Sequence, residues 1–124
     1  MKKIKNILVV EDDEDARWGL ALFLKKEGFT VFEAKDGVDA TTLLNKEEVD
    51  LILSDLKMPN LDGLELLKLC KKKNEKAPFV MMTAYGDCES FCEILNCGAF
   101  EYLNKPVKLE EVLLLIKKIE ELEK

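Results

Sequence analysis

The sequence predicts one α/β domain in which five parallel strands alternate with five helices. Three observations predict this fold: short apolar runs recur with the length of strands, amphipathic stretches with helical spacing separate them, and turn residues stand between the two. Such alternation is typical of a parallel sheet with right-handed crossovers and helices on both faces. The 124 residues fit a single domain spanning residues 1–124, and a hydrophobic content of 48% is enough for a sizeable core.

Residues 1–50 are predicted to hold two strand–helix units. The first strand is expected at residues 7–10, which are all apolar. A helix then ends near Gly28, a residue suited to the left-handed backbone conformation, and its apolar positions at helical spacing are Ala16, Leu20, Phe23 and Leu24. Residues 30–34 are rich in β-branched and aromatic side chains, which favours a second strand. A turn at Asp36-Gly37 is expected to precede a shorter helix with apolar residues Val38, Leu43 and Leu44.

Three more units are predicted after residue 50. Residues 51–54 begin with three aliphatic side chains, which predicts a strand buried on both faces. A loop containing Pro59 precedes a third helix, which a lysine-rich stretch ends before residue 78. A strand at residues 79–82 leads to a helix at residues 89–97, closed by Gly98. A brief strand at residues 100–103 is expected to stop at Asn104-Lys105-Pro106, and a last helix runs from Lys108 to about Lys124.

The composition excludes several classes of function. A net charge of -6 argues against a nucleic-acid surface, because neutralising phosphates requires clustered Lys and Arg. No apolar stretch approaches the roughly 20 residues of a membrane span, and residues 1–10 lack the shape of a signal peptide. We therefore expect a cytoplasmic protein that binds neither nucleic acid nor membrane. The absence of histidine excludes any phosphohistidine, His-based triad or His metal ligand within this chain.

Polar side chains gather where four of the predicted strands end. Glu11 and Asp12 follow the first strand, and Asp55 follows the third. Thr83 and Lys105 follow the fourth and fifth strands. Because the carboxyl ends of parallel strands share one edge of a sheet, these residues are expected to converge there. The carboxylates are ligands suited to Mg²⁺, which keeps water and phosphate oxygens in its other positions.

The predicted set of groups suits phosphoryl transfer. It combines a nucleophilic carboxylate at Asp55, a divalent cation, the ammonium of Lys105 and the hydroxyl of Thr83. Together these groups can neutralise and hold a phosphoryl group during transfer.

Each of these residues also has a purely structural explanation. The acids of residues 11–15 are favoured at the positive end of a helix, and Asp55 can serve as a helix cap or turn residue. Thr83 can be an ordinary strand-end hydroxyl, and Lys105 a solvated surface lysine. Convergence of these residues at one edge is what favours the chemical explanation.

Four sequence motifs resemble one known family. They are VVEDDED at residues 9–15, SDLKMPNLDGLELL at residues 54–67, MMTAYGD at residues 81–87 and GAFEYLNKP at residues 98–106. On these motifs the chain resembles the receiver domains of bacterial two-component response regulators over essentially its whole length, most of all those of nitrogen-regulation-type transcription activators. The resemblance implies a flavodoxin-like (βα)5 fold with a doubly wound parallel sheet in strand order 2-1-3-4-5.

The resemblance also implies a role for each site residue. Asp55 would be the phosphoacceptor. Mg²⁺ would be held by Asp12 directly, by Glu11 through water, by Asp55 and by the backbone carbonyl of Lys57. Thr83 and Lys105 would contact the phosphoryl oxygens, and Tyr102 would be an aromatic switch coupled to Thr83.

The same resemblance implies the partners. A sensor histidine kinase would donate the phosphoryl group, and the domain would catalyse only its own phosphorylation and dephosphorylation. The signal would leave through the face formed by the fourth helix, the fifth strand and the last helix. A homodimer through this face, a C-terminal output domain outside this chain and a role in transcription regulation are further expectations.

The last predicted helix carries two apolar sets. One consists of Val112, Leu115, Ile119 and Leu122, and the other of Leu109, Leu113 and Ile116. We expect one set to face the sheet and the other to be available to a partner helix. Fraying of a terminal helix is the simpler alternative for so short a stripe.

Two other functions are compatible with an aspartate at a strand end. A Mg²⁺-dependent phosphatase of the haloacid dehalogenase type needs a second Asp where this chain has Lys57. A flavodoxin-like FMN carrier shares the fold, but the acids of residues 11–15 would repel the FMN phosphate.

Cys88 and Cys92 are spaced four residues apart, as on one face of a helix, and Cys97 lies about a turn beyond them. A redox or soft-metal site is one interpretation of these thiols. Their spacing matches no common zinc pattern, so small buried hydrophobic side chains are the expected role for them.

Overall fold

A computed structural model describes residues 3–84 and 91–122 of the chain, without the side chains of Phe91 and Cys92. It contains a five-stranded parallel sheet in the order β2-β1-β3-β4-β5. The strands are β1 Asn6–Val10, β2 Thr30–Ala34, β3 Leu51–Asp55, β4 Phe79–Ala84 and β5 Glu101–Lys105. The helices are α1 Glu14–Lys26, α2 Gly37–Lys46, α3 Gly63–Lys72, α4 Phe91–Asn96 and α5 Leu109–Leu122. The predicted α/β fold and strand order are confirmed.

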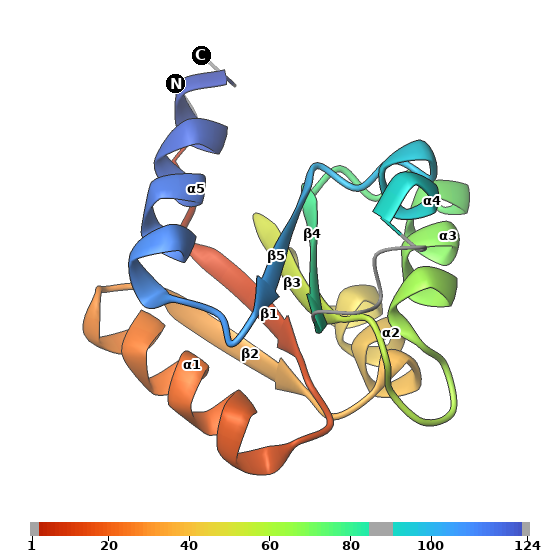
Figure 1. Ribbon diagram of the computed structural model, residues 1–124, viewed down its shortest axis with the longest axis horizontal. Helices are drawn as coiled ribbons and strands as arrows, with labels where there is room; N and C mark the ends of the chain where they lie inside the picture. Colours follow the sequence, from red (N-terminus) through yellow and green to blue (C-terminus); the bar gives the residue numbers. More distant parts are fainter. Residues whose placement is uncertain (1–2, 85–90, 123–124) are drawn as a thin grey trace.

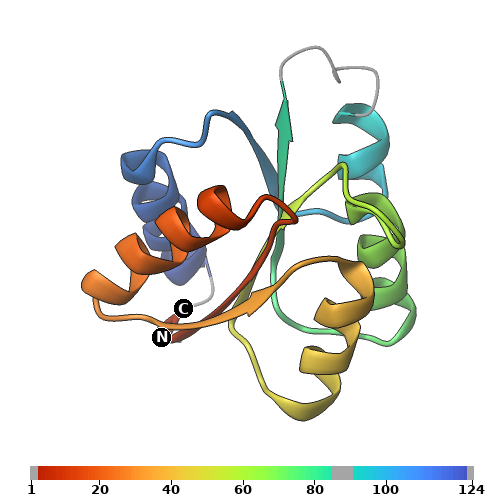
Figure 2. The ribbon, with the colours of Figure 1, turned by 90° about the horizontal axis from the view of Figure 1, so that it is seen from below.

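The sheet divides the core into two apolar layers. Figures 1 and 2 show α1 and α5 on one face of the sheet and α2, α3 and α4 on the other. Alternate residues of β1 supply both layers: Ile7 and Val9 pack toward α1 and α5, while Leu8 and Val10 pack toward α2 and α3. All four side chains are fully buried, as expected for a central strand of a parallel sheet.

Helix ends follow the local sequence. Gly28 and Gly98 have φ values of 99° and 102°, so the two glycines predicted to close helices do adopt the left-handed conformation. The predicted turn at Asp36-Gly37 is instead the start of α2, where the Asp36 side chain accepts a hydrogen bond from the Asp39 amide. An aspartate that bonds a backbone amide two or three residues ahead serves turns and helix caps alike, which explains the error.

Four strands are longer than predicted, and β1 is extended by one residue at its start, Asn6. Asp55 is the last residue of β3, and β4 continues through Thr83 and Ala84. Strand β5 begins one residue later than expected and continues to Lys105, because Asn104 and Lys105 pair with Thr83 and Ala84. Pro106 comes directly after Lys105, the last paired residue of β5. The strand therefore continues up to the proline instead of stopping at residue 103.

The two apolar sets predicted for the last helix are not separated as expected. The buried residues Val112, Leu115 and Ile119 belong to one set, but Ile116 from the other set is buried with them. Leu122 was assigned to the first set and is 65% exposed, as is Leu114 at 67%. The stripe toward the sheet is therefore one wide apolar face that takes residues from both sets.

No helix in the described part of the chain is long and apolar enough to cross a membrane.

Candidate phosphoryl-transfer site

The carboxyl edge of the sheet brings the predicted polar residues together. Glu11 follows β1 directly, and its amide donates to the Ala34 carbonyl of β2 at 3.0 Å, which extends the sheet by one residue. Asp55, Thr83 and Lys105 lie at the ends of β3, β4 and β5, which are consecutive neighbours in the sheet. Convergence of these residues follows from the parallel topology, as predicted.

Lys105 links two carboxylates of this edge. Its Nζ atom lies 2.8 Å from Glu11 Oε1 and 2.9 Å from Asp55 Oδ2. Burial alone would lower the pKa of Lys105, but the hydrogen bonds and charges of Glu11 and Asp55 outweigh burial and raise it. The ammonium is therefore charged throughout the physiological pH range and neutralises part of the buried negative charge.

Three carboxylates form a cluster with the geometry of a cation site. One oxygen each from Glu11, Asp12 and Asp55 lies within 4.8 Å of the others. Glu11 and Asp55 are buried, whereas Asp12 is exposed. Desolvation and the hydrogen bond with Glu11 raise the pKa of Asp12. A bound cation would favour the charged carboxylate and so lower this pKa again. All three groups are hard oxygen donors, and this donor set fits Mg²⁺ better than a soft metal.

The remaining acids of residues 11–15 have structural roles. Asp13 caps α1, because its side chain accepts hydrogen bonds from the amides of Asp15 and Ala16. Glu14 and Asp15 lie in the first turn, where the helix dipole favours negative charge. Three of these five acids therefore have the structural explanation, and Glu11 and Asp12 remain the candidates for the chemical one.

Thr83 and Tyr102 lie on one face of two adjacent strands. Tyr102 pairs in register with Met81, which is two residues before Thr83 and packs in the same apolar layer as Tyr102. Since side chains two residues apart on a strand share a face, Thr83 and Tyr102 are diagonal neighbours. Thr83 is fully buried, and its hydroxyl lies 3.5 Å from the Ala84 carbonyl oxygen.

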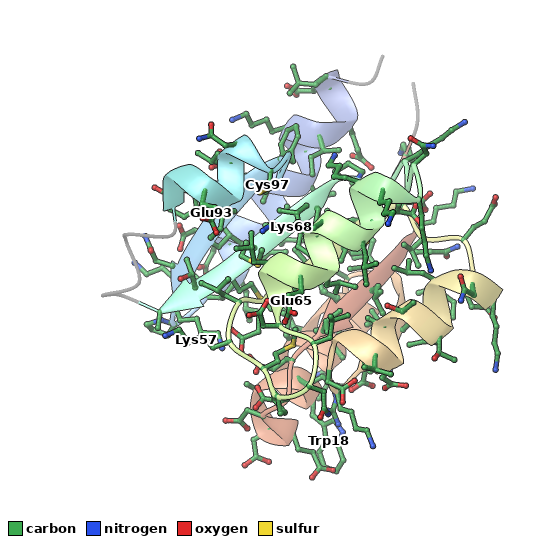
Figure 3. All side chains as sticks on the ribbon, turned by 90° about the vertical axis from the view of Figure 1, so that its right-hand side faces the viewer. Trp18, Lys57, Glu65, Lys68, Glu93 and Cys97 are labelled. Atoms are coloured by element: carbon green, nitrogen blue, oxygen red, sulfur yellow. The ribbon has the colours of Figure 1, made fainter. Side chains whose placement is uncertain are left out.

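The loop between β3 and α3 is fastened to α2. Asn60 Nδ2 donates to Asp36 Oδ2 at 3.0 Å, and the Gly37 amide donates to the Leu61 carbonyl at 3.1 Å. The Asp39 amide and the Asn60 side chain lower the pKa of Asp36, so its carboxylate stabilises the fold at neutral pH and loses that effect as the pH falls through the lowered pKa. Figure 3 shows Lys57 on this loop, with its side chain exposed.

Gly63 controls the position of Asp55 from the other end of the loop. Its amide donates to the Leu56 carbonyl at 2.8 Å. A Cβ atom at position 63 would overlap the Asp55 carbonyl oxygen and lie 2.8 Å from Met81 Sδ. Only glycine therefore allows the first turn of α3 to pack against the end of β3.

We expect Gly63→Ala to lower the free energy of unfolding by about 1 to 3 kcal/mol, because the overlap must displace the Asp55 backbone. Urea denaturation of both proteins measures this change. The matched control is Gly19→Ala, because Gly19 lies inside α1 with nothing within 4 Å of its added Cβ. The control should be more stable than the parent by up to about 1 kcal/mol through helix propensity. Equal stability of the two variants would contradict the close packing of Gly63.

A pocket of about 390 Å³ opens beside the cluster. Glu11, Asp13 and Lys105 form its polar side. Its apolar side consists of Ala16, Leu20, Met82, Pro106, Val107 and Leu109. The pocket gives an incoming group access to the region next to Lys105.

The alternative of a redox or soft-metal site at the thiols receives no support from the described residues. Cys88 and the side chain of Cys92 lie outside them. Cys97 is half-buried just beyond α4 (Figure 3), and Cys70 is a buried core residue of α3. Burial raises the pKa of the Cys70 thiol to about 11, which keeps it protonated and unreactive at neutral pH.

Comparison with known proteins agrees with this geometry. Residues 7–117 match the model of the response regulator receiver domain family. The chain is 38% identical over 113 residues to the DNA-binding transcriptional regulator NtrC of Proteus hauseri, covering 91% of this chain and 24% of that protein. It is 36% identical over 114 residues to sporulation initiation phosphotransferase F of Bacillus subtilis (strain 168), covering 92% of each.

Solved structures show the same relationship. The crystal structure of the receiver domain of NtrX from Brucella abortus superimposes with a TM-score of 0.85 at 32% identity, covering 90% of this chain and 95% of that one. The chain spans about a quarter of the length of the NtrC and AtoC proteins that it matches. The similarity to NtrC and NtrX confirms the predicted likeness to regulators of the nitrogen type. The chain belongs to the family of response regulator receiver domains.

Proposed function

We propose that residues 1–124 form one receiver domain that accepts a phosphoryl group on Asp55 and acts as a phosphorylation-activated signalling switch. The observation that carries this proposal is the contact between the Lys105 ammonium and the Asp55 carboxylate at 2.9 Å. The carboxylates of Glu11 and Asp12 lie next to this contact. A phosphoryl group that reached Asp55 would meet a carboxylate nucleophile and a cation side by side, which supports the proposal.

Mg²⁺ fits the acidic cluster as a cofactor. Glu11, Asp12, Asp55 and the backbone carbonyl of Lys57 are the groups that would hold it. When bound, the ion would neutralise negative charge on the phosphoryl oxygens.

The reaction that we propose is a transfer between two nucleophiles. An Asp55 carboxylate oxygen attacks the phosphorus atom of a phosphohistidine, the new O–P bond forms as the P–N bond breaks, and the departing imidazole takes up a proton. We propose a sensor histidine kinase as the donor, since the phosphohistidine must lie outside these 124 residues, which contain no histidine. Lys105 stabilises the charge on the transferred group, and the Thr83 hydroxyl donates to one of its oxygens. Beyond its own phosphorylation and dephosphorylation, we propose no enzymatic activity.

The acyl phosphate would act as a switch through Thr83 and Tyr102. Movement of Thr83 toward the new oxygens opens space on the shared face of β4 and β5, and Tyr102 turns into it. The α4-β5-α5 face then changes its affinity for partners, which is a shift between two packed states. We propose homodimerisation through this face and transmission to a C-terminal output domain of a transcription regulator.

Incubation with acetyl phosphate and Mg²⁺ tests the proposal. Intact-mass spectrometry should show one phosphoryl increment with Mg²⁺ and none with EDTA. Continuous turnover of acetyl phosphate without a stable increment would instead support a phosphatase, and a yellow protein would support an FMN carrier. No increment in a chain that binds Mg²⁺ would refute phosphorylation as its switch.

A further inference from the structure

The side chain of Arg17 joins three parts of the fold next to the acidic cluster. From the first turns of α1, its Nη1 atom donates to the Glu11 carbonyl oxygen at 3.0 Å. Its Nε atom donates to Glu33 Oε1 at 3.3 Å. The side chain of Arg17 is only 14% exposed and that of Glu33 is 27% exposed, so both contacts are largely shielded from water.

The two partners of Arg17 belong to different parts of the fold. Glu33 belongs to β2 and pairs in register with Val9 of β1, so it is part of the sheet. The Glu11 carbonyl belongs to the peptide unit that leads into Asp12, and it lies between the end of β1 and the cap residue of α1. Arg17 therefore adds a side-chain link between β2 and the segment that carries two carboxylates of the cluster, beside the bond from the Glu11 amide to the Ala34 carbonyl.

We infer that Arg17 is a positioning residue for the cation site, an inference that rests on the proposed Mg²⁺ binding. It acts through the backbone of Glu11, which fixes where the Glu11 and Asp12 side chains begin. The bidentate guanidinium suits this task, since its planar fork can serve a carbonyl and a carboxylate at once.

The charge of Arg17 has the opposite effect, which makes the inference testable by sign. A cation close to the cluster repels Mg²⁺, so removal of the charge alone would tighten Mg²⁺ binding. Loss of positioning would weaken it. Only the positioning role predicts that Mg²⁺ affinity falls when Arg17 is removed.

The test measures Mg²⁺ dissociation constants by isothermal titration calorimetry in the unphosphorylated protein. Arg17→Met should weaken binding about tenfold, the lower end of what loss of a group supporting a metal ligand costs. Lys25→Met is the matched control, because Lys25 lies on the same helix and pairs with the same Glu33 at 3.7 Å but makes no bond to Glu11. The control should bind Mg²⁺ as tightly as the parent or slightly more tightly.

Two further variants guard against a general loss of structure. Arg17→Lys keeps the charge but lacks the fork, and it should also weaken Mg²⁺ binding. Glu33→Gln leaves the bond from Arg17 to the Glu11 carbonyl in place. It should therefore weaken Mg²⁺ binding by less than Arg17→Met does. Thermal melts in EDTA should show all four variants folded at the temperature of the titration.

The outcomes separate this inference from the function that it refines. Unchanged or tighter Mg²⁺ binding by Arg17→Met, with normal binding by the parent, overturns the role of Arg17 alone. Failure of the parent protein to bind Mg²⁺ overturns both the role of Arg17 and the proposed cation site.

Discussion

Asp55→Asn is expected to abolish phosphorylation by acetyl phosphate. The substitution keeps the shape of the side chain, but an amide offers no carboxylate oxygen for attack and cannot form an acyl phosphate. The fold should persist, because Lys105 keeps its contact with Glu11 at 2.8 Å. Intact-mass spectrometry after incubation with Mg²⁺ measures the phosphoryl increment directly.

The matched control for Asp55→Asn is Asp15→Asn. Asp15 is an exposed acid in the first turn of α1, so its replacement removes the same charge near the same edge of the sheet. This control should be phosphorylated like the parent. If the Asp55→Asn and Asp15→Asn variants both kept the phosphoryl increment, the phosphoacceptor would be another residue.

Lys105→Met is expected to slow phosphorylation by about 100-fold or more. Removal of one preorganised donor to a developing charge typically costs this much in rate. The variant also leaves the Glu11 and Asp55 carboxylates without their shared cation, and we expect a loss of about 1 to 3 kcal/mol in unfolding free energy. The loss is moderated because Lys105 is 30% exposed. Since the folded protein has a raised Lys105 pKa, this stability difference should be present at neutral pH and fade only as the pH rises through the folded pKa.

A second lysine separates site chemistry from general charge in this experiment. Lys118→Met removes an exposed ion pair between α5 and β5, in which Lys118 Nζ lies 3.8 Å from Glu101 Oε2. The Lys118 variant should match the parent in phosphorylation rate and closely in stability. Equal phosphorylation rates for Lys105→Met and the parent would show that Lys105 does not stabilise the transferred group.

The sheet and its functional edge could be predicted because both depend on local patterns. Apolar runs located the strands, and parallel topology then required residues such as Asp55 and Lys105 to meet at one edge. Strand ends were less accurate, since the length of β5 is set by pairing with Ala84 on β4 rather than by its own sequence. The assignment of Leu122 to a buried stripe failed for a similar reason, because two overlapping apolar patterns on α5 leave the choice of face to tertiary packing.

The supporting residues of the site could not be found from the sequence. Arg17 contacts Glu33, which lies sixteen positions away in the chain, and periodicity carries no sign of that contact. Gly63 is one position of the motif at residues 54–67, but nothing in that motif indicates that its lack of a side chain lets α3 pack against the Asp55 carbonyl. Asp36 did carry a local signal, but a turn and a helix cap share it, and its bond to Asn60 depends on the folded loop.

Borohydride trapping is the measurement that tests the central claim most directly. An acyl phosphate on aspartate is reduced to homoserine, whereas a phosphate ester on a hydroxyl side chain is not. Phosphorylation with acetyl phosphate and Mg²⁺, reduction and peptide mapping should therefore find homoserine at position 55 and at no other aspartate, with none in the EDTA control. Homoserine at Asp12 or Asp13 instead, or a phosphoryl increment that borohydride leaves intact, would contradict Asp55 as the phosphoacceptor.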